Sequence, residues 1–335
     1  MKSGLKDLSI IIVTYDGDDM LKNCLDSLVR EKIDKSQIVV VDNLSSKRTR
    51  KLVCSYKTPL YIANAVNSGF AGGNNKALSF CRGKYILLLN NDTIVHSRES
   101  ILELIEFLDE NPKAAVAQGT MVLPLRNGNI GGCGTYLTPF GFMMNIGFDE
   151  KDSPSFHEKR QIFSAVGAFM MIRRETLAET DGLFRTHFWS YYEESDFCHR
   201  VHLAGKEVWY VPTKPIDHLC GKTSQKFPRA DIMARFLRNG YFSLSVNLSA
   251  HSRFFILPLF SLTIIFHAFL SLLRGNYKMF IAEMNIFRDI ASSKKKIAAA
   301  RRRISAVRKV SDSEIFSKTM KFPSLGYLAR NAFKS

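Results

Sequence analysis

Apolar residues in the N-terminal half of the chain alternate between short continuous runs and helical spacing. The runs Leu8–Thr14 (LSIIIVT) and 37–41 (QIVVV) have the length and β-branched composition of buried strands. Between them, Leu21, Leu25 and Leu28 recur at the spacing of one helix face. A strand, a helix and a second strand in close succession are typical of a βαβ unit, so the pattern predicts an α/β fold with a parallel sheet.

Further strands and helices are predicted downstream in the same way. The predicted strands cover 60–63, 84–89, 165–172 and 208–211, and the predicted helices cover 76–81 and 101–108. Asp42, the glycine-rich segment 67–75 and Asp92 each follow a predicted strand. Because ligands of open α/β sheets bind at the carboxyl ends of the strands, we expect these three features at one edge.

The character of the chain changes after about residue 230. We therefore predict an α/β domain over 1–230 and a helical C-terminal region over 231–335. Residues 254–273 carry no formal charge and are flanked by Arg253 and Arg274. A stretch of this length can span a bilayer, but a helix that lies in the membrane interface is a serious alternative because the stretch contains Pro258 and His267.

Basic residues are concentrated in the same region. The formal net charge is +16, and residues 251–335 alone contain 16 Lys or Arg against 4 Asp or Glu. The basic clusters 294–296, 301–303 and 308–309 repeat with Ile290, Ile297 and Ile304 in step, which predicts a basic amphipathic helix over about 288–310. We expect this helix to contact an anionic membrane surface, and we expect no nucleic acid partner because the rest of the chain is nearly neutral.

The cysteines and the N-terminus indicate a compartment. The six cysteines form no C-x-x-C pair, and the first residues lack the long apolar stretch of a secretory signal. We therefore expect the protein in a reducing cytoplasm.

Several polar residues are candidates for chemistry, each with a structural alternative. Asp42 could accept a hydrogen bond from a nucleoside or could cap a turn. Glycines in 67–75 could let backbone N–H groups approach a phosphate, or the segment could be a plain loop. Asp92 with its flanking amides could hold a divalent cation, or could cap a helix. His218 could be a metal ligand or, more often for such residues, a core histidine.

Three carboxylates lie close together beside aromatic residues. Glu193, Glu194 and Asp196 follow Trp189, Tyr191 and Tyr192. Neighbouring carboxylates in an apolar environment raise one another's pKa, which suits a general base. The alternative is the solvated acidic first turn of a helix.

Six of these motifs, in this order, resemble glycosyltransferase family 2. They are IIVTYD (11–16), VVDN (40–43), NSGFAGGNN (67–75), LLLNND (87–92), GAFMMIRRE (167–175) and YYEESDFCHR (191–200). Within that family, the chain looks most like rhamnosyltransferase-type enzymes of bacterial polysaccharide assembly. The resemblance implies a GT-A-type fold, a Rossmann-like mixed sheet flanked by helices, and an inverting transfer that depends on Mg²⁺ or Mn²⁺.

The resemblance also implies roles for individual residues. Glu194 would be the general base, supported by Glu193 and Asp196, and Asp92 and His218 would bind the metal. The nucleotide-sugar would contact Thr14, Asp16, Asp42, Gly69, Gly72, Asn74 and Asn91. Two positions depart from the family pattern, because Asn90 replaces the first acid of the D-x-D motif and the base is Glu in place of Asp.

The resulting hypothesis is a hexosyltransferase with a nucleotide-diphospho-sugar donor and a lipid-linked glycan acceptor. It would synthesise O-antigen or capsule polysaccharide at the cytoplasmic face of a bacterial inner membrane, as a peripheral or single-span protein. The alternative is a catalytically weak, nucleotide-sugar-binding scaffold of a glycan assembly complex.

Overall fold

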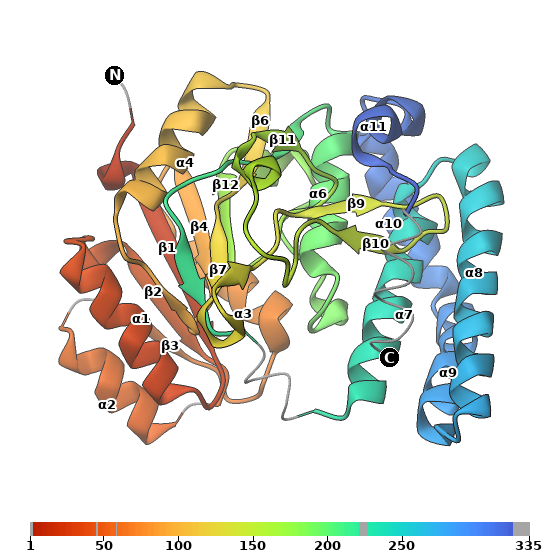
Figure 1. Ribbon diagram of the computed structural model, residues 1–335, viewed down its shortest axis with the longest axis horizontal. Coiled ribbons are helices and arrows are strands. Elements are labelled where there is room, and N and C mark those ends of the chain that lie inside the picture. Colours follow the sequence, from red (N-terminus) through yellow and green to blue (C-terminus); the bar gives the residue numbers. More distant parts are fainter. Residues whose placement is uncertain (1–2, 45, 58, 221–226, 324–335) are drawn as a thin grey trace.

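The computed structural model describes residues 3–44, 46–57, 59–220 and 227–323, so residues 324–335 of the predicted C-terminal region lie outside the described residues. Its main feature is an eight-stranded mixed sheet in the order β11-β13-β6-β12-β4-β1-β2-β3 (Figure 1). The strands are β1 (Leu8–Thr14), β2 (Ile38–Asp42), β3 (Leu60–Ala63), β4 (Tyr85–Leu89), β6 (Ala114–Gln118), β11 (Arg160–Gln161), β12 (Phe169–Arg173) and β13 (Glu207–Tyr210).

Side chains of the central strands alternate between two apolar layers. Ile10 and Ile12 of β1 pack with α1 (Asp18–Arg30), α2 (Lys47–Ser55) and α4 (Glu99–Glu110) on one face. Ile11 packs with α3 (Gly69–Ala77) and α6 (Glu193–Leu203) on the other. Helices thus cover both faces of the sheet, which explains why its strands are apolar at nearly every position.

Two strand pairings bring distant segments to the carboxyl end of β4. β12 runs antiparallel to β4, with Phe169 opposite Leu89, so residues 166–168 lie beside the end of β4. A second, smaller sheet consists of β5 (Thr93–Ile94), β14 (Ile216–His218), β7 (Met121–Leu123) and β8 (Asn129–Ile130). There, His218 pairs with Thr93. The remaining hairpin pairs β9 (Thr135–Leu137) with β10 (Met143–Asn145).

The C-terminal region is a group of helices that packs against α6. It contains α7 (Arg229–Asn247), α8 (Ala250–Leu273), α9 (Tyr277–Ser292), α10 (Lys294–Val307) and α11 (Asp312–Thr319). The short helix α5 (Thr176–Glu179) belongs to the N-terminal domain. Figure 1 shows α8 and α9 side by side at the end of the molecule opposite α1 and α2, with α7 between them and the sheet.

Most predicted elements match, and the differences have physical reasons. The strands at 8–14 and 60–63 are confirmed, and those predicted at 37–41 and 84–89 are shifted by one residue or less at each end. The predicted loop 67–75 is largely helical, because α3 already begins at Gly69 and buries Ala71 and Gly73 against the sheet. The predicted strand 165–172 begins only at Phe169, because Gly167 and Ala168 form a turn in which the Phe169 N–H donates to the Val166 carbonyl.

The predicted basic helix over 288–310 is wrong as a continuous element. α9 ends at Ser292 and α10 begins at Lys294. Ile297 and Ile304 are buried, together with Ala300, in the apolar cluster that α7 and α8 also enter. The apolar seam of α10 therefore stabilises the protein itself and is not available to a membrane.

Candidate active site

A cavity of about 320 Å³ opens at the carboxyl ends of β1 and β4. Its wall is built from segments that the strand pairings bring together: residues 13–15, 90–92, 166–168 and 189–194, with contributions from α3 and β14. Of the predicted site residues, those that line it are Thr14, Gly69, Asn91, Asp92, Glu193, Glu194 and His218. The structure thus brings these seven predicted residues to one cavity.

Asp92 and His218 form one end of the cavity. The pairing of β5 with β14 places the His218 Nε2 atom 3.5 Å from Asp92 Oδ1, and the Leu219 N–H donates to the Asp92 carbonyl oxygen at 2.9 Å. Next to them, the Asn91 side chain donates to the Thr14 hydroxyl at 2.9 Å. The turn at 90–92 is therefore fixed to both β1 and β14.

The polar atoms at this end suit a hard divalent cation. Asp92 Oδ1 and His218 Nδ1 are buried and have no hydrogen-bond partner in the described structure. Within the same residues, no group of three or more His, Cys, Asp or Glu side chains is arranged to hold a metal. A cation here would have at most two ligands from such side chains, which leaves other positions to oxygens of a bound molecule and water, as Mg²⁺ prefers.

Glu193 and Glu194 also line the cavity, from the first turn of α6. Burial and the neighbouring charge of Glu194 raise the pKa of Glu193 well above its usual range. Burial also raises the pKa of Glu194, although the backbone N–H groups of Glu194 and Gly167 partly stabilise its carboxylate. Glu193 is buried, whereas Glu194 is partly exposed along the cavity wall. Glu194 is thus the better placed of the two to accept a proton from a bound molecule.

Other predicted residues surround the cavity without lining it. Asp42 is fully buried, and its carboxylate accepts hydrogen bonds from the backbone of Leu44 and Ser46 and from the Tyr61 hydroxyl, so it shapes the loop after β2. Asn43, which the sequence reasoning missed, lines the cavity in its place and donates to the Gly69 carbonyl at 2.9 Å.

Three more nucleotide-sugar candidates also lie outside the lining. The Asn74 side chain donates to the Phe70 carbonyl within α3. Gly72 packs against Ser68, where an added Cβ would come within 2.7 Å of the Ser68 side chain. Asp16, at φ 50°, follows β1 but is not part of the wall. These residues shape the loops that line the cavity.

Aromatic residues complete the wall, and only some had a sequence signal. Trp189 and Tyr191 stand beside the acidic motif. Phe70 and Phe227 also line the cavity. The Phe227 ring packs edge-on against the Trp189 ring, with 5.7 Å between the ring centres. Phe227 is far from the motifs in sequence, so no local pattern could have identified it.

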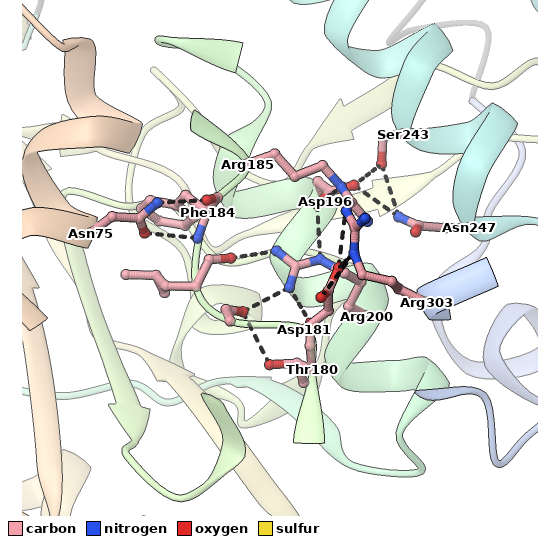
Figure 2. A network of polar contacts seen from close by, with 12 residues as sticks. Asn75, Thr180, Asp181, Phe184, Arg185, Asp196, Arg200, Ser243, Asn247 and Arg303 are labelled. Atoms are coloured by element: carbon pink, nitrogen blue, oxygen red, sulfur yellow. Dashed lines mark hydrogen bonds and ion pairs between the residues drawn. The ribbon is translucent and has the colours of Figure 1, made fainter. Parts of the chain in front are cut away.

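Asp196 lies outside the cavity, in a buried polar network (Figure 2). Its Oδ2 atom accepts from Arg185 at 3.0 Å and Arg200 at 2.9 Å, and its Oδ1 atom accepts from Ser243 at 2.9 Å and Asn247 at 3.0 Å. Burial would raise the pKa of Asp196, but the two guanidinium charges and the Ser243 hydroxyl hold it well below its usual range. A fully buried carboxylate that accepts these four hydrogen bonds stabilises the fold and cannot contact a substrate.

Comparison with known proteins identifies the class. Residues 9–180 match the family model described as Glycosyl transferase family 2. The chain belongs to this family, as its ordered motifs predict.

Curated relatives cover most of the chain. It is 28% identical over 260 residues to the low-salt glycan biosynthesis hexosyltransferase Agl10 of Haloferax volcanii, covering 72% of this chain and 79% of the relative. It is 26% identical over 238 residues to the rhamnosyltransferase WbbL of Escherichia coli, covering 65% of this chain and 85% of the relative. These relatives support glycosyltransferase activity.

Solved structures confirm the predicted GT-A fold. GalNAc-T7 with UDP, GalNAc and Mn²⁺ aligns at a TM-score of 0.59 and 14% identity, covering 86% of this chain and 57% of that chain. The mannosyltransferase PcManGT of Pyrobaculum calidifontis with GDP-Man and Mn²⁺ aligns at a TM-score of 0.52 and 13% identity, covering 90% and 84%.

The Asp196 network predicts that a substitution at Asp196 strongly lowers the free energy of unfolding, because solvent does not screen these buried charges. Asp196→Asn removes the charge that faces two buried guanidinium groups, so we expect a loss of about 3–5 kcal/mol in the free energy of unfolding. Because the folded pKa is depressed, this stabilisation is present above the usual pKa of 3.8 and is lost as the pH falls below it. Urea titrations at neutral and acidic pH measure both effects.

The exposed pair Asp152 and His157 offers a matched control. Asp152→Asn should change the free energy of unfolding by less than about 0.5 kcal/mol. An equally small effect of Asp196→Asn would contradict the structural role of the buried network.

Proposed function

We propose that this protein is an inverting glycosyltransferase that moves a hexose from a nucleotide-diphospho-sugar to a hydroxyl of a lipid-linked glycan. The product would be a cell-surface polysaccharide such as O-antigen or capsule. The observation that carries the proposal is a single cavity that Asp92, His218 and Glu194 line together. A transferase needs both a site for the leaving diphosphate and a base for the incoming hydroxyl.

The end of the cavity near Asp92 is the proposed donor site. Thr14, Asn43, Gly69 and Asn91 line the cavity, and Thr14 and Asn91 offer a hydroxyl and an amide group to a nucleotide. Asp92 and His218 would hold Mg²⁺ or Mn²⁺, which when bound neutralises charge on the departing diphosphate. The Mn²⁺ in both structural neighbours supports this choice.

The proposed base is Glu194, with Glu193 in support. Burial and the neighbouring charge of Glu194 raise the pKa of Glu193, which disfavours a second charge beside the proposed base. Glu194 accepts the proton of the acceptor hydroxyl as that hydroxyl attacks the anomeric carbon from the side opposite the leaving group. A single displacement of this kind inverts the anomeric centre. The hexosyltransferase and rhamnosyltransferase relatives favour rhamnose or another hexose as the transferred sugar.

The proposed membrane contact is the outer face of α8 and α9. Among the described residues, Ala250–Leu273 is a helix long and apolar enough to cross a membrane by length and composition. Its side chains that are exposed include Phe254, Phe255, Leu262, Phe266, Phe269 and Leu273, and α9 adds Tyr277 and Ile281. Large contiguous apolar surfaces of this kind are typical of membrane or protein contacts.

The opposite stripe of α8 argues for a helix that lies on the bilayer surface. Ile256, Phe260, Ile264 and Ala268 are buried in the protein at a spacing of four residues. The His267 Nδ1 atom also lies 2.6 Å from Oε1 of Glu283, a fully buried residue of α9. If α8 left the protein to span a membrane, it would expose this stripe. We therefore propose peripheral attachment to the cytoplasmic face of an anionic membrane.

A donor panel tests the function. Purified protein should release nucleoside diphosphate from one nucleotide sugar with Mg²⁺ or Mn²⁺, and EDTA should abolish the release. Asp92→Asn should lower turnover about 100-fold, since it removes one cation ligand and about 2.7 kcal/mol of transition-state stabilisation. Donor binding by calorimetry without release from any donor would instead favour the scaffold alternative, in keeping with Asn90 in the metal motif.

The pH dependence of turnover tests the base. Glu194 must lose its proton before it can act as a base, and its pKa is raised above 4.5, the usual pKa of glutamate. The pH profile of kcat should therefore have a rising limb whose midpoint lies above pH 4.5. Glu194→Gln should lower kcat by about 10²–10⁴ and remove the limb. The matched variant Glu193→Gln should keep the limb. If Glu194→Gln kept both turnover and limb, the assignment of the base would be wrong.

Liposome sedimentation tests the membrane contact. The protein should bind vesicles with anionic lipid more strongly than neutral vesicles, and less strongly at high salt. Phe266→Ser combined with Phe269→Ser should weaken binding at least about tenfold, because both rings leave the exposed face. Leu125→Ser, which changes an exposed apolar residue on another surface, should leave binding unchanged. Undiminished binding of the double variant would exclude the α8 face.

A further inference from the structure

The segment that leads into α6 has an unusual backbone. Trp189, Tyr191 and Tyr192 have φ values of 62°, 69° and 74°. Residues with a side chain rarely adopt positive φ, and three within four positions persist only where surrounding contacts impose them. This segment directly precedes Glu193 and Glu194, so its conformation determines where both carboxylates point.

A single side chain of α7 contacts the carbonyl groups of this segment. The Asn239 Nδ2 atom lies 3.1 Å from the carbonyl oxygen of Phe188, 3.2 Å from that of Ser190 and 2.8 Å from that of Tyr191. Asn239 is 2% exposed, and the Arg238 guanidinium donates to its Oδ1 atom at 3.2 Å. The amide is therefore oriented with its donor atom toward the three carbonyls.

Two neighbours of Asn239 on α7 contact the same segment. The Arg235 guanidinium lies 4.3 Å from the centre of the Trp189 ring and donates to the Ser190 hydroxyl at 3.2 Å. An added Cβ at Gly240 would come within 2.8 Å of the Tyr192 ring, so the helix backbone packs directly on that ring. One face of α7 thus supports the whole strained segment.

The segment is also tied to the proposed donor site. The Trp189 carbonyl accepts from the Ala71 N–H of α3 at 3.1 Å, and its indole N–H donates to the Asn67 carbonyl at 3.0 Å. An added Cβ at Gly69 would come within 2.0 Å of the Trp189 carbonyl oxygen. The strained segment therefore lies between residues 67–71 on one side and α7 on the other.

We propose that Asn239 is a positioning residue for catalysis, which holds residues 188–191 in the conformation that directs Glu194 into the cavity. The inference rests on the transferase function proposed above. It requires the donor N–H groups of the amide, because only a donor can satisfy three carbonyl oxygens. Asn239→Asp keeps the shape of the side chain but replaces the donor with an acceptor, so it repels the carbonyls that the native residue binds.

The test combines turnover with the fluorescence of Trp189. The chain has two tryptophans, so Trp209→Phe leaves Trp189 as the single emitter. In that background, Asn239→Asp should lower kcat about 100-fold, as expected for a misplaced catalytic group, while the donor KM stays within about threefold. The emission of Trp189 should shift to the red, because its ring loses the packing of Arg235 and the segment becomes more exposed.

Two further variants keep the test decisive. Ile264→Ala removes a buried side chain of another helix, α8, which makes no hydrogen bond to the segment, so it should lower stability but leave kcat and the emission unchanged. Asn239→Ser retains one donor and should give an intermediate kcat, and it decides the outcome if Asn239→Asp does not fold. Parental kcat and emission in the folded Asn239 variant would overturn the inference. Absence of transfer by the parent with every donor would instead refute the proposed function, and the Trp189 emission alone would then decide the role of Asn239.

Discussion

The buried carboxylate of Asp196 is the interaction on which the active-site arrangement depends. It joins three parts of the chain: the segment with Arg185, the helix α6 with Arg200, and the more distant α7 with Ser243 and Asn247. Each partner satisfies a buried charge or polar group that would otherwise destabilise the fold. Asp196 and Glu194 share one short helix, so the network that fixes α6 also fixes the proposed base.

The same helix therefore separates two kinds of acidic residue. Asp196 faces guanidinium groups, and its pKa is held low, whereas Glu193 and Glu194 face apolar and aromatic surroundings that raise theirs. Three carboxylates within four residues have opposite electrostatic roles because the helix directs them to different sides. The sequence spacing of the three carboxylates is compatible with this division, but it does not show which of them faces the guanidinium groups.

Much of the sheet and several residues that line the cavity were predictable from the sequence. Continuous β-branched runs such as Leu8–Thr14 occur only where both faces of a strand are covered, and the residues after such runs reach the ligand-binding edge. For Asp42 the sequence left a nucleoside contact and a turn cap open, and the backbone N–H groups of Leu44 and Ser46 that donate to its carboxylate match the turn cap. The contributions of Phe227 and Asn239 depend on tertiary packing of the helices and leave no local pattern. The seven-residue repeat of α10 was visible, but the sequence could not show that its apolar side faces protein.

The position of α7 has a consequence for how such enzymes diversify. This helix contacts the segment before the proposed base through Asn239, completes the Asp196 network through Ser243 and Asn247, and packs against α8, whose other face is apolar and exposed. The C-terminal region, which would adapt the enzyme to a new membrane or acceptor, therefore cannot be exchanged as a whole between relatives. Recombination between relatives would preserve the active site only if α7 stayed with the N-terminal domain, which places the permissible junction in the short link at Leu248 and Ser249.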